Sequence, residues 1–401
     1  MDPTFDQVDD RFGNDDPGII YDAANETGTI EPGIVVTSGS QDGIVSTRDG
    51  STLLNHGEIL SASAKGVDFS GDHASVTNFV LARIIGATDG VSFDGPAGSL
   101  ENHGTILGLT GDGVAFDEPT SAVALTNDGD IFGRDAGVLQ ISDHTGGRID
   151  NAGSIRSHTD GIVIDTEDGF TTFITNAAGA TIRGGVNAIH MELGGINLDN
   201  HGTLIGGIFD EANVRDVITN HGKIQGDVDL GGDDDLFNGT GGTAGFVDGG
   251  DGNDVLIGGS QADRLFGGDG NDRVNGAGGN DMLGGGAGLD TLTGGPGSDQ
   301  FVFESILGGN NIDRITDFTP HVDRIDLEFG GVGPNGVLAA SHFHVGAAAV
   351  HASDRIIYNP NNGFLFFDQD GTGRDPAIHF ATLAPHLNLH NTDFFVHIIV
   401  S

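Results

Sequence analysis

Six aspartates recur at nine-residue intervals between Gly249 and Val302, and carboxylates at a fixed spacing can bind metal ions. They are Asp254, Asp263, Asp272, Asp281, Asp290 and Asp299. Each is the sixth residue of a nonapeptide that begins with glycine and carries a large residue at position eight. Ca²⁺ takes about six to eight oxygen ligands, mainly carboxylates and carbonyls. The spacing therefore predicts a series of calcium sites.

The glycine-rich half of each nonapeptide is expected to form a tight turn that supplies further ligands. The turn residues that we assign to the metal sites are Gly249, Gly250, Asp251, Gly252, Gly258, Gly267, Gly268, Asp269, Gly270, Gly285, Gly286 and Gly288. Three residues depart from the pattern: Gln261, Ala277 and Leu289. We expect the second repeat, which contains Gln261, to hold the weakest site.

The last three residues of each nonapeptide predict a short strand whose eighth residue points inward. These inward residues are Leu256, Leu265, Val274, Leu283, Leu292 and Phe301. Two nonapeptides would make one coil, which places alternate aspartates on opposite edges. Stacked carboxylates at about 4.8 Å would repel one another, and Ca²⁺ between the turns would remove the conflict. Three turns on each edge predict four interior sites.

The repeat extends weakly upstream of Gly249. In the stretch LGGDDDLFN, Asp235 takes the sixth position and Phe237 the eighth, which predicts a weak additional site at Asp235. The next nine residues keep Phe246 at the eighth position but have Ala244 in place of aspartate. The alternative interpretation of the whole stretch is a glycine-rich acidic linker without metal. Such a linker would need neither the phase nor the apolar eighth residue.

The nonapeptides resemble the repeats of the RTX, or hemolysin-type, calcium-binding proteins. That resemblance implies a parallel β-roll with bound Ca²⁺ and an extracellular location.

The chain has no cysteine, and its net charge is −43 from 59 acidic and 16 basic residues. Such charge opposes compaction unless cations bind, so we expect folding to depend on calcium. It also excludes a nucleic-acid-binding surface.

A second repeat of 20 to 25 residues lies upstream, and its anchor is an asparagine. The anchors are Asn55, Asn78, Asn102, Asn127, Asn151, Asn176, Asn200 and Asn220. Short alternating strands at this period predict a right-handed parallel β-helix of about eight coils with about 24 residues each. Each asparagine is expected at a corner, where it would bond the neighbouring backbone and tolerate left-handed angles.

Four of these asparagines precede a histidine, which raises the question of a histidine metal site. The residues are His56, His103, His201 and His221. They do not lie on four successive coils, so we expect them to point to solvent rather than to share a metal.

The C-terminal hundred residues resemble the domain that follows the repeats in serralysin-type proteases and related RTX proteins. The matching stretches are Asp313–Phe318, Asp368–Gly373 and Asp393–Val396, and we expect paired strands around DRITDF and DRIDLEF. The resemblance implies an uncleaved signal for a type I secretion apparatus, although five further residues follow the usual end. It also suggests that Asp317 and Asp326 close the last calcium sites. The acidic N-terminal residues lack the apolar segment of a signal peptide.

The expected organisation is all-β. Residues 1–50 form an N-terminal segment or cap, 51–228 the β-helix, 229–303 the calcium-binding β-roll, and 304–401 a β-rich C-terminal secretion domain. The predicted function is that of a secreted, non-enzymatic calcium-binding solenoid with a surface, matrix or adhesin-like role. Possible partners are the type I secretion apparatus and an extracellular polysaccharide or cell surface, without membrane insertion.

The alternative function is a polysaccharide-acting lyase or epimerase on the β-helix. The sequence contains no HExxH and no G-x-S-x-G, and a cysteine nucleophile is impossible. The alternative would need a cluster of charged groups on one face. The candidates are Arg148, Arg156, His158, Asp160 and Arg183. An intracellular or periplasmic calcium buffer is a third possibility.

Overall fold

The structure is a computed structural model, and it describes residues 4–5, 18–21, 23–117, 121–142, 146–166, 169–304 and 311–397. Its contacts divide the chain into two units, Met1–Asp227 and Val228–Ser401. Strands dominate both, and the described residues include only two short 3₁₀ helices, Ala340–His342 and Asn391–Asp393. None of the described helical segments has the length and apolar composition of a membrane-spanning helix. The predicted all-β parallel solenoid is confirmed.

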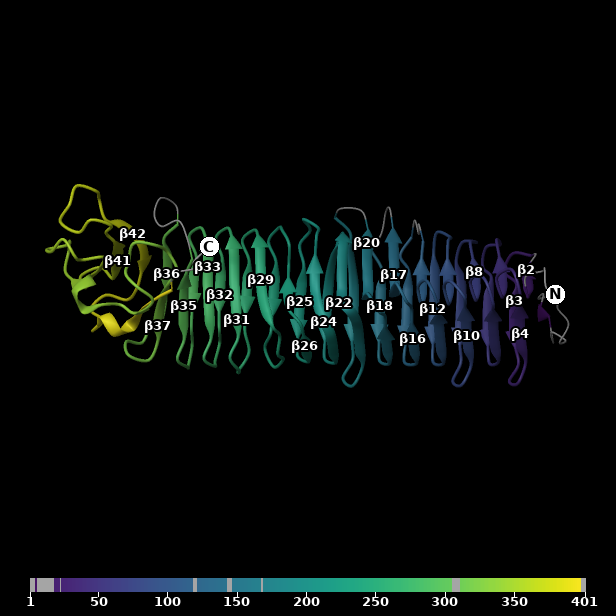
Figure 1. The fold of residues 1–401 in the computed structure, drawn as a ribbon. Helices are drawn as coiled ribbons and strands as arrows, with labels where there is room; N and C mark the ends of the chain where they lie inside the picture. The colour runs from purple at the N-terminus through teal and green to yellow at the C-terminus, as the bar shows by residue number, and fades with distance from the viewer. Residues whose placement is uncertain are drawn as a thin grey trace. The chain divides into compact units, whose positions relative to one another are not determined.

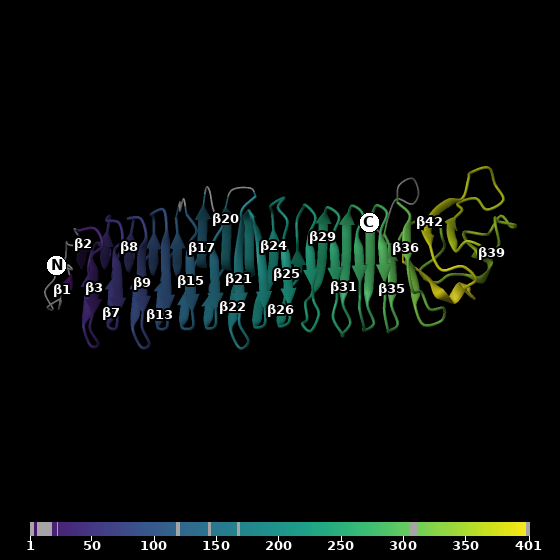
Figure 2. The ribbon, with the colours of Figure 1, turned by 180° about the vertical axis from the view of Figure 1, so that it is seen from behind.

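In the first unit each coil contributes three strands, and each strand pairs in parallel with its counterparts on the neighbouring coils (Figure 1, purple to teal). The first row consists of β3 (Thr27–Ile30), β6 (Thr52–Asn55), β9 (Ala74–Asn78), β12 (Gly98–Asn102), β15 (Ala124–Asn127), β18 (Arg148–Asn151), β21 (Thr171–Asn176), β23 (Gly195–Asn200) and β25 (Val217–Asn220). Figure 2, from behind, labels β9, β15 and β21 of this row. The short β1 (Thr4–Phe5) pairs with β3.

Two further rows complete the coils of the first unit. One row consists of β4 (Val35–Ser38), β7 (Glu58–Ser61), β10 (Arg83–Gly86), β13 (Thr105–Gly108), β16 (Asp130–Phe132), β19 (Ser154–Arg156), β22 (Thr181–Leu193), β24 (Thr203–Asp210) and β26 (Lys223–Gln225). The other consists of β2 (Ile19–Tyr21), β5 (Ile44–Ser46), β8 (Val67–Phe69), β11 (Val91–Phe93), β14 (Val114–Phe116), β17 (Ala136–Ser142) and β20 (Asp160–Thr166), and it continues in the second halves of β22 and β24.

The interior of this unit is built from one or more aliphatic or aromatic residues per strand, stacked on their equivalents in the neighbouring coils. Leu100, Leu125 and Ile149 follow one another in the first row and are at most 2% exposed. Phe93 of β11 and Phe116 of β14 stack with ring centroids 5.2 Å apart. Burial of these continuous apolar columns holds the coils together.

The anchor asparagines form a buried ladder rather than a series of left-handed corners. None of the eight has a positive φ, and each of the first seven side chains donates Nδ2 to Oδ1 of the next asparagine at 2.7–2.9 Å. The expected left-handed angles are therefore wrong. An amide suits this place because it offers both a donor and an acceptor, so identical residues can pair along the stack.

The solenoid also begins earlier than residue 51. Strands β3, β4 and β5 pair in parallel with β6, β7 and β8 and so form a coil within residues 1–50, which we expected to be an N-terminal segment or a cap. Ile30 lies in register with Asn55. Because the asparagine anchor is missing from this coil, the repeat could not be recognised from it.

In the second unit the repeats form two rows of short parallel strands. One row consists of β28 (Leu236–Asn238), β30 (Val255–Ile257), β32 (Arg273–Asn275), β34 (Thr291–Thr293) and β36 (Asp313–Ile315). The other consists of β27 (Val228–Asp229), β29 (Phe246–Asp251), β31 (Arg264–Asp269), β33 (Met282–Ala287), β35 (Gln300–Phe303) and β37 (Arg324–Leu327). All six predicted inward residues are at most 1% exposed.

One inward residue upstream was assigned to the wrong position. Val247 is 1% exposed and pairs with Leu265, whereas Phe246 is half-buried on the outer face with its ring 5.2 Å from that of Phe266. Phe237 pairs with Leu256, 19 residues later, whereas Leu256 pairs with Val274 after 18. The extra residue shifts the phase of the degraded repeat by one.

The C-terminal residues add β38 (Gly336–Val337), β39 (Phe343–Val345), β40 (Ile356–Asn359), β41 (Phe364–Phe367), β42 (Ile378–Thr382) and β43 (Phe394–Val396). The DRI and RIDL segments, β36 and β37, do not pair with each other as expected. Instead β36 continues one row of the roll and β37 the other. Strands β41 and β42 are antiparallel, and the acidic stretch Asp368–Gly373 lies in the turn between them.

Candidate metal centre

The repeat aspartates form two ladders, one on each edge of the roll, as their spacing predicts. On one edge the main-chain N–H of Asp254 donates to Oδ1 of Asp272 at 2.7 Å, and that of Asp272 donates to Asp290 at 2.8 Å. On the other edge the main-chain N–H of Asp263 donates to Oδ1 of Asp281 at 2.9 Å, and that of Asp281 donates to Oδ1 of Asp299 at 3.0 Å. Each bond spans 18 residues, which is one coil.

The second carboxylate oxygen of most ladder members is buried without a hydrogen-bond donor. This holds for Oδ2 of Asp254, Asp272, Asp281, Asp290 and Asp299, which are all at most 1% exposed. A buried carboxylate that lacks a donor or counter-charge costs several kcal/mol, roughly, when it is ionised. Five such atoms in periodic positions indicate a site for cations.

The first glycine of each repeat leaves the space that these oxygens occupy. A Cβ built on Gly267 would overlap Oδ2 of Asp272, and it would lie 2.6 Å from the carbonyl oxygen of Gly285 on the next coil. Gly249 bears the same relation to Asp254 and Gly285 to Asp290. A carboxylate oxygen and a main-chain carbonyl thus converge between successive turns, and such a donor set fits a hard cation such as Ca²⁺.

The other assigned turn residues shape the loops around this space. Gly268 and Gly270 have φ of 106° and 151°, in the region that favours glycine, and Gly250, Gly252, Gly286 and Gly288 repeat these angles. Gly258 faces Oδ2 of Asp263. Asp251 and Asp269 pair in register at the ends of β29 and β31, where both are exposed and lie apart from the buried ladder.

The second repeat differs from the others. Asp263 is only half-buried, and its Oδ2 accepts the main-chain N–H of Gly259 at 2.6 Å. Its carboxylate is therefore satisfied within its own turn. This is the repeat in which Gln261 replaces glycine, and for which we expected the weakest site.

The ladders extend beyond the six nonapeptides. Upstream, Asp235 donates its N–H to Oδ1 of Asp254 at 2.8 Å. Downstream, Asp313 accepts from Asp290 at 3.3 Å and Asp323 from Asp299 at 3.0 Å. Sequence reasoning missed Asp313 and Asp323 because longer loops separate them from the preceding aspartates and the nine-residue phase is lost.

The two residues that we expected to close the last calcium sites, Asp317 and Asp326, differ in their contacts. Asp317 accepts the N–H groups of Gly294 and Gly295 at 3.0 and 2.8 Å, so it covers the last turn. Asp326, by contrast, is bound by the guanidinium of Arg324. The place that we expected Asp326 to fill is taken by Asp323.

Burial raises the pKa values of the ladder carboxyls. The pKa of Asp272 rises to about 7 and those of Asp254 and Asp281 to about 6, mainly because burial disfavours the charged form. For Asp313 burial comes first and the charge of Asp290 second, and together they raise its pKa to about 8. Without a cation the ladder thus resists full ionisation at neutral pH.

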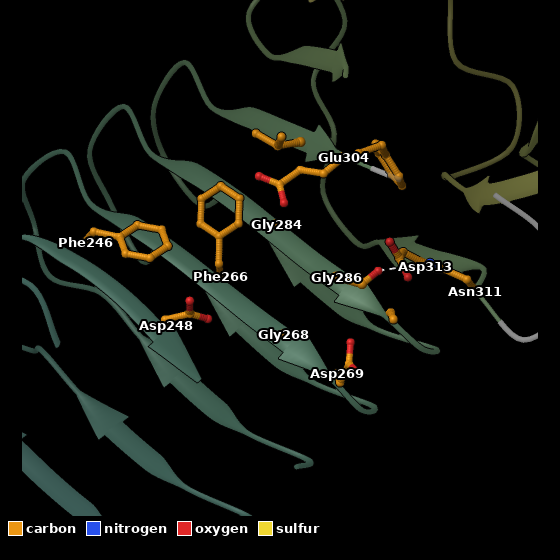
Figure 3. Close-up of a pocket in the computed structure, with 13 residues that line it drawn as sticks. Phe246, Asp248, Phe266, Gly268, Asp269, Gly284, Gly286, Glu304, Asn311 and Asp313 are labelled. Carbon is orange, nitrogen blue, oxygen red and sulfur yellow. Dashed lines mark hydrogen bonds between the residues drawn. The ribbon is translucent and has the colours of Figure 1, made fainter. Parts of the chain in front are cut away.

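An outward-facing hollow of about 270 Å³ lies beside the ladder on β29, β31, β33 and β35 (Figure 3). Phe246 and Phe266 provide apolar walls, while Asp248 and Glu304 place carboxylates beside them. Burial, and then the charges of Glu328 and Asp248, raise the pKa of Glu304. No basic side chain lines the hollow among the described residues, so its charge disfavours a polyanionic ligand.

The residues suggested for a polysaccharide-acting enzyme are brought together only in part. Arg148 lies on β18 and pairs with Asp150, while Arg156 and Arg183 lie in register in a different row, on β19 and β22. Asp160 approaches His190, with Nδ1 and Oδ2 3.7 Å apart. His158 instead packs its ring against Phe132, with centroids 5.3 Å apart.

Comparison with known proteins agrees with the repeat assignment. Residues 248–283 and 285–305 match the family model of the RTX calcium-binding nonapeptide repeat, in four copies. The search of curated proteins found no match. Among solved structures, the chain is similar to the AlgE6R3 subunit of the Azotobacter vinelandii mannuronan C5-epimerase, with 29% identity over 39% of this chain and 82% of that one and a TM-score of 0.26. The chain therefore contains RTX nonapeptide repeats, which imply binding of Ca²⁺.

Proposed function

We propose that this protein is exported and that extracellular Ca²⁺ triggers the folding of its nonapeptide region. In this proposal the solenoid then serves a non-enzymatic role at a cell surface or in an extracellular matrix. RTX repeats are typical of secreted proteins, and the calcium would be held by the ladder aspartates with the carbonyl oxygens of the first-position glycines.

The observation that carries the proposal is the set of buried carboxylate oxygens without donors. Oδ2 of Asp254, Asp272 and Asp290 recurs on one edge, and Oδ2 of Asp281 and Asp299 on the other. Where calcium is scarce, the charges of these groups would oppose folding. Where calcium is plentiful, the ion supplies the positive charge that they lack, and binding energy becomes folding energy.

Far-ultraviolet circular dichroism of the full chain tests the calcium step. We expect chelation to reduce the β-sheet signal and added Ca²⁺ to restore it, with Mg²⁺ much less effective because it demands a small octahedral site. An unchanged spectrum in chelator would refute the proposal.

Export is tested separately, in a host that carries a type I secretion apparatus. The support comes from the Asp393–Val396 stretch, whose resemblance implies a C-terminal signal. We expect the full chain in the medium and a chain without its last sixty or so residues to remain in the cells. Equal release of both would contradict the secretion step and leave the calcium step standing.

A further inference from the structure

Two of the histidines that follow the anchor asparagines lie side by side near the C-terminal end of the first unit. His201 and His221 are on successive coils, and their ring centroids are 4.9 Å apart. We expected these histidines to point to solvent without sharing a metal. Both are exposed, but the structure brings this pair together, and Asp199 lies beside them with Oδ1 3.1 Å from Nε2 of His201.

The ladder beneath positions this pair. Asn200 donates Nδ2 to Oδ1 of Asn220 at 2.7 Å, and the main-chain N–H of His221 donates to the carbonyl oxygen of Asn200 at 2.8 Å. Since each histidine directly follows a ladder asparagine, the fixed register of the ladder holds the two imidazoles next to each other.

We propose that Asp199, His201 and His221 form a surface site for Zn²⁺ or a similar late first-row divalent ion. One ligand atom from each residue lies within 4.8 Å of the others. Ligands bound tetrahedrally at about 2.0 Å from zinc lie about 3.3 Å apart. Asp199 Oδ1 and His201 Nε2 are already 3.1 Å apart, close to that separation, and a ring nitrogen of His221 lies within 4.8 Å of both ligand atoms.

The donor set selects a different metal from that of the repeats. Imidazole suits zinc, copper and nickel, whereas carboxylate and carbonyl oxygens suit calcium. Three protein ligands also leave a coordination position open, to water or to a group on a partner. The site is thus distinct in chemistry from the aspartate ladders.

His103 provides a matched control at the same corner of another coil. It also has a carboxylate two residues earlier, with Nε2 3.5 Å from Glu101, but its Nδ1 contacts Asp128 at 2.7 Å. The two carboxylates approach opposite ring nitrogens, so no single atom of His103 can join both around one ion. The neighbouring coil offers Phe79, not a second histidine.

Isothermal titration of the full chain with Zn²⁺ tests the site, with Ca²⁺ in large excess so that carboxylate-only sites are filled. We expect one zinc per chain, at least tenfold weaker binding in His201→Ala and His221→Ala, and unchanged binding in His103→Ala. Chemical shifts of the histidine rings should change for His201 and His221. No saturable site, or an equal loss in His103→Ala, would overturn the assignment. His201 and His221 are exposed and His103 is half-buried, and circular dichroism checks that each variant folds.

Discussion

The first glycine of a nonapeptide is the residue on which the cation site depends most directly. We expect Gly267→Ala to abolish or weaken calcium-induced folding, because the new methyl group would overlap Oδ2 of Asp272 and crowd the carbonyl oxygen of Gly285. The φ of Gly267 is not in the left-handed region, so the effect is steric rather than conformational. The midpoint of a calcium titration followed by circular dichroism measures it.

Gly330→Ala is the control for this substitution. A Cβ at Gly330 meets no atom within 4 Å, and the backbone there is open to alanine. We expect its calcium midpoint to match that of the wild type. If both variants shift equally, the first-position glycine has no special role in the site.

A half-buried carboxyl outside the nonapeptide repeats predicts a pH dependence of stability. Burial raises the pKa of Asp112 to about 7, although its Oδ1 accepts the N–H of Ala136 at 2.7 Å. The unfolded value is about 3.9, so the folded state binds the proton more tightly. Its contribution therefore favours folding below about pH 4, and this advantage is lost as pH rises through about 7.

Asp112→Asn removes that charge and keeps an acceptor for Ala136. We expect the variant to be more stable than the wild type by on the order of 2 kcal/mol at pH 8, and by much less at pH 4. Thermal unfolding at both values, with calcium held constant, measures the difference. The exposed Glu31→Gln is the comparison, and a gain in Asp112→Asn that is the same at both pH values would contradict the reasoning.

At the scale of elements, the asparagine ladder links one strand of each coil to the next. Asn127 Oδ1 accepts from Asn102 and Asn127 Nδ2 donates to Asn151, so Asn127→Ala removes both ladder bonds. Asn102 Nδ2 then keeps only its 3.4 Å contacts with the carbonyl oxygens of Gly104 and Asp130, and Asn151 Oδ1 keeps only the N–H of Gly153. We expect a loss of about 1–3 kcal/mol, as measured by urea unfolding. Thr126→Ala, exposed on the same strand, should cost almost nothing; similar losses in both would show that the ladder contributes little.

The sequence predicted the elements wherever the repeat kept its phase. The inward residues Leu256 and Val274 and the ladder position of Asp272 followed from the nine-residue period alone. The prediction failed where one residue was inserted, as at Phe246, or where the anchor was replaced, as at Ile30. A period predicts register only while each coil has the same length, and long-range pairing restores the register after an irregular coil without leaving a local signal.

The calcium-site residues were likewise predictable only where the nine-residue spacing holds. The spacing placed Asp254 and Asp290 on one edge, but the extension to Asp313 depends on a longer loop. The approach of His201 to His221 was also hidden, because we judged the four histidines as a set and not as a pair on adjacent coils. The pairing of β23 with β25 places Asn200 opposite Asn220, and the two histidines that follow them are therefore neighbours.

At the scale of the whole molecule, one unit contains a stacked ladder of neutral amides and the other contains ladders of carboxyl groups. The amides of the first unit pair with one another and are neutral, so that ladder is complete without an ion. The carboxylates of the second unit offer only acceptors when ionised, and Oδ2 of five repeat aspartates has no donor. Calcium dependence should therefore be concentrated in the second unit.

Hydrogen exchange, resolved by segment, tests this difference in the full chain. On chelation of calcium we expect the amides of residues 249–303 to exchange at least tenfold faster, because the uncompensated carboxylates favour opening of the turns. The amides of residues 98–117 should keep most of their protection, since their asparagine ladder needs no cation. Added Ca²⁺ should restore protection in residues 249–303 alone. Equal loss in both segments would show that the amide ladder cannot sustain its coils without calcium, and the dependence would then belong to the chain as a whole.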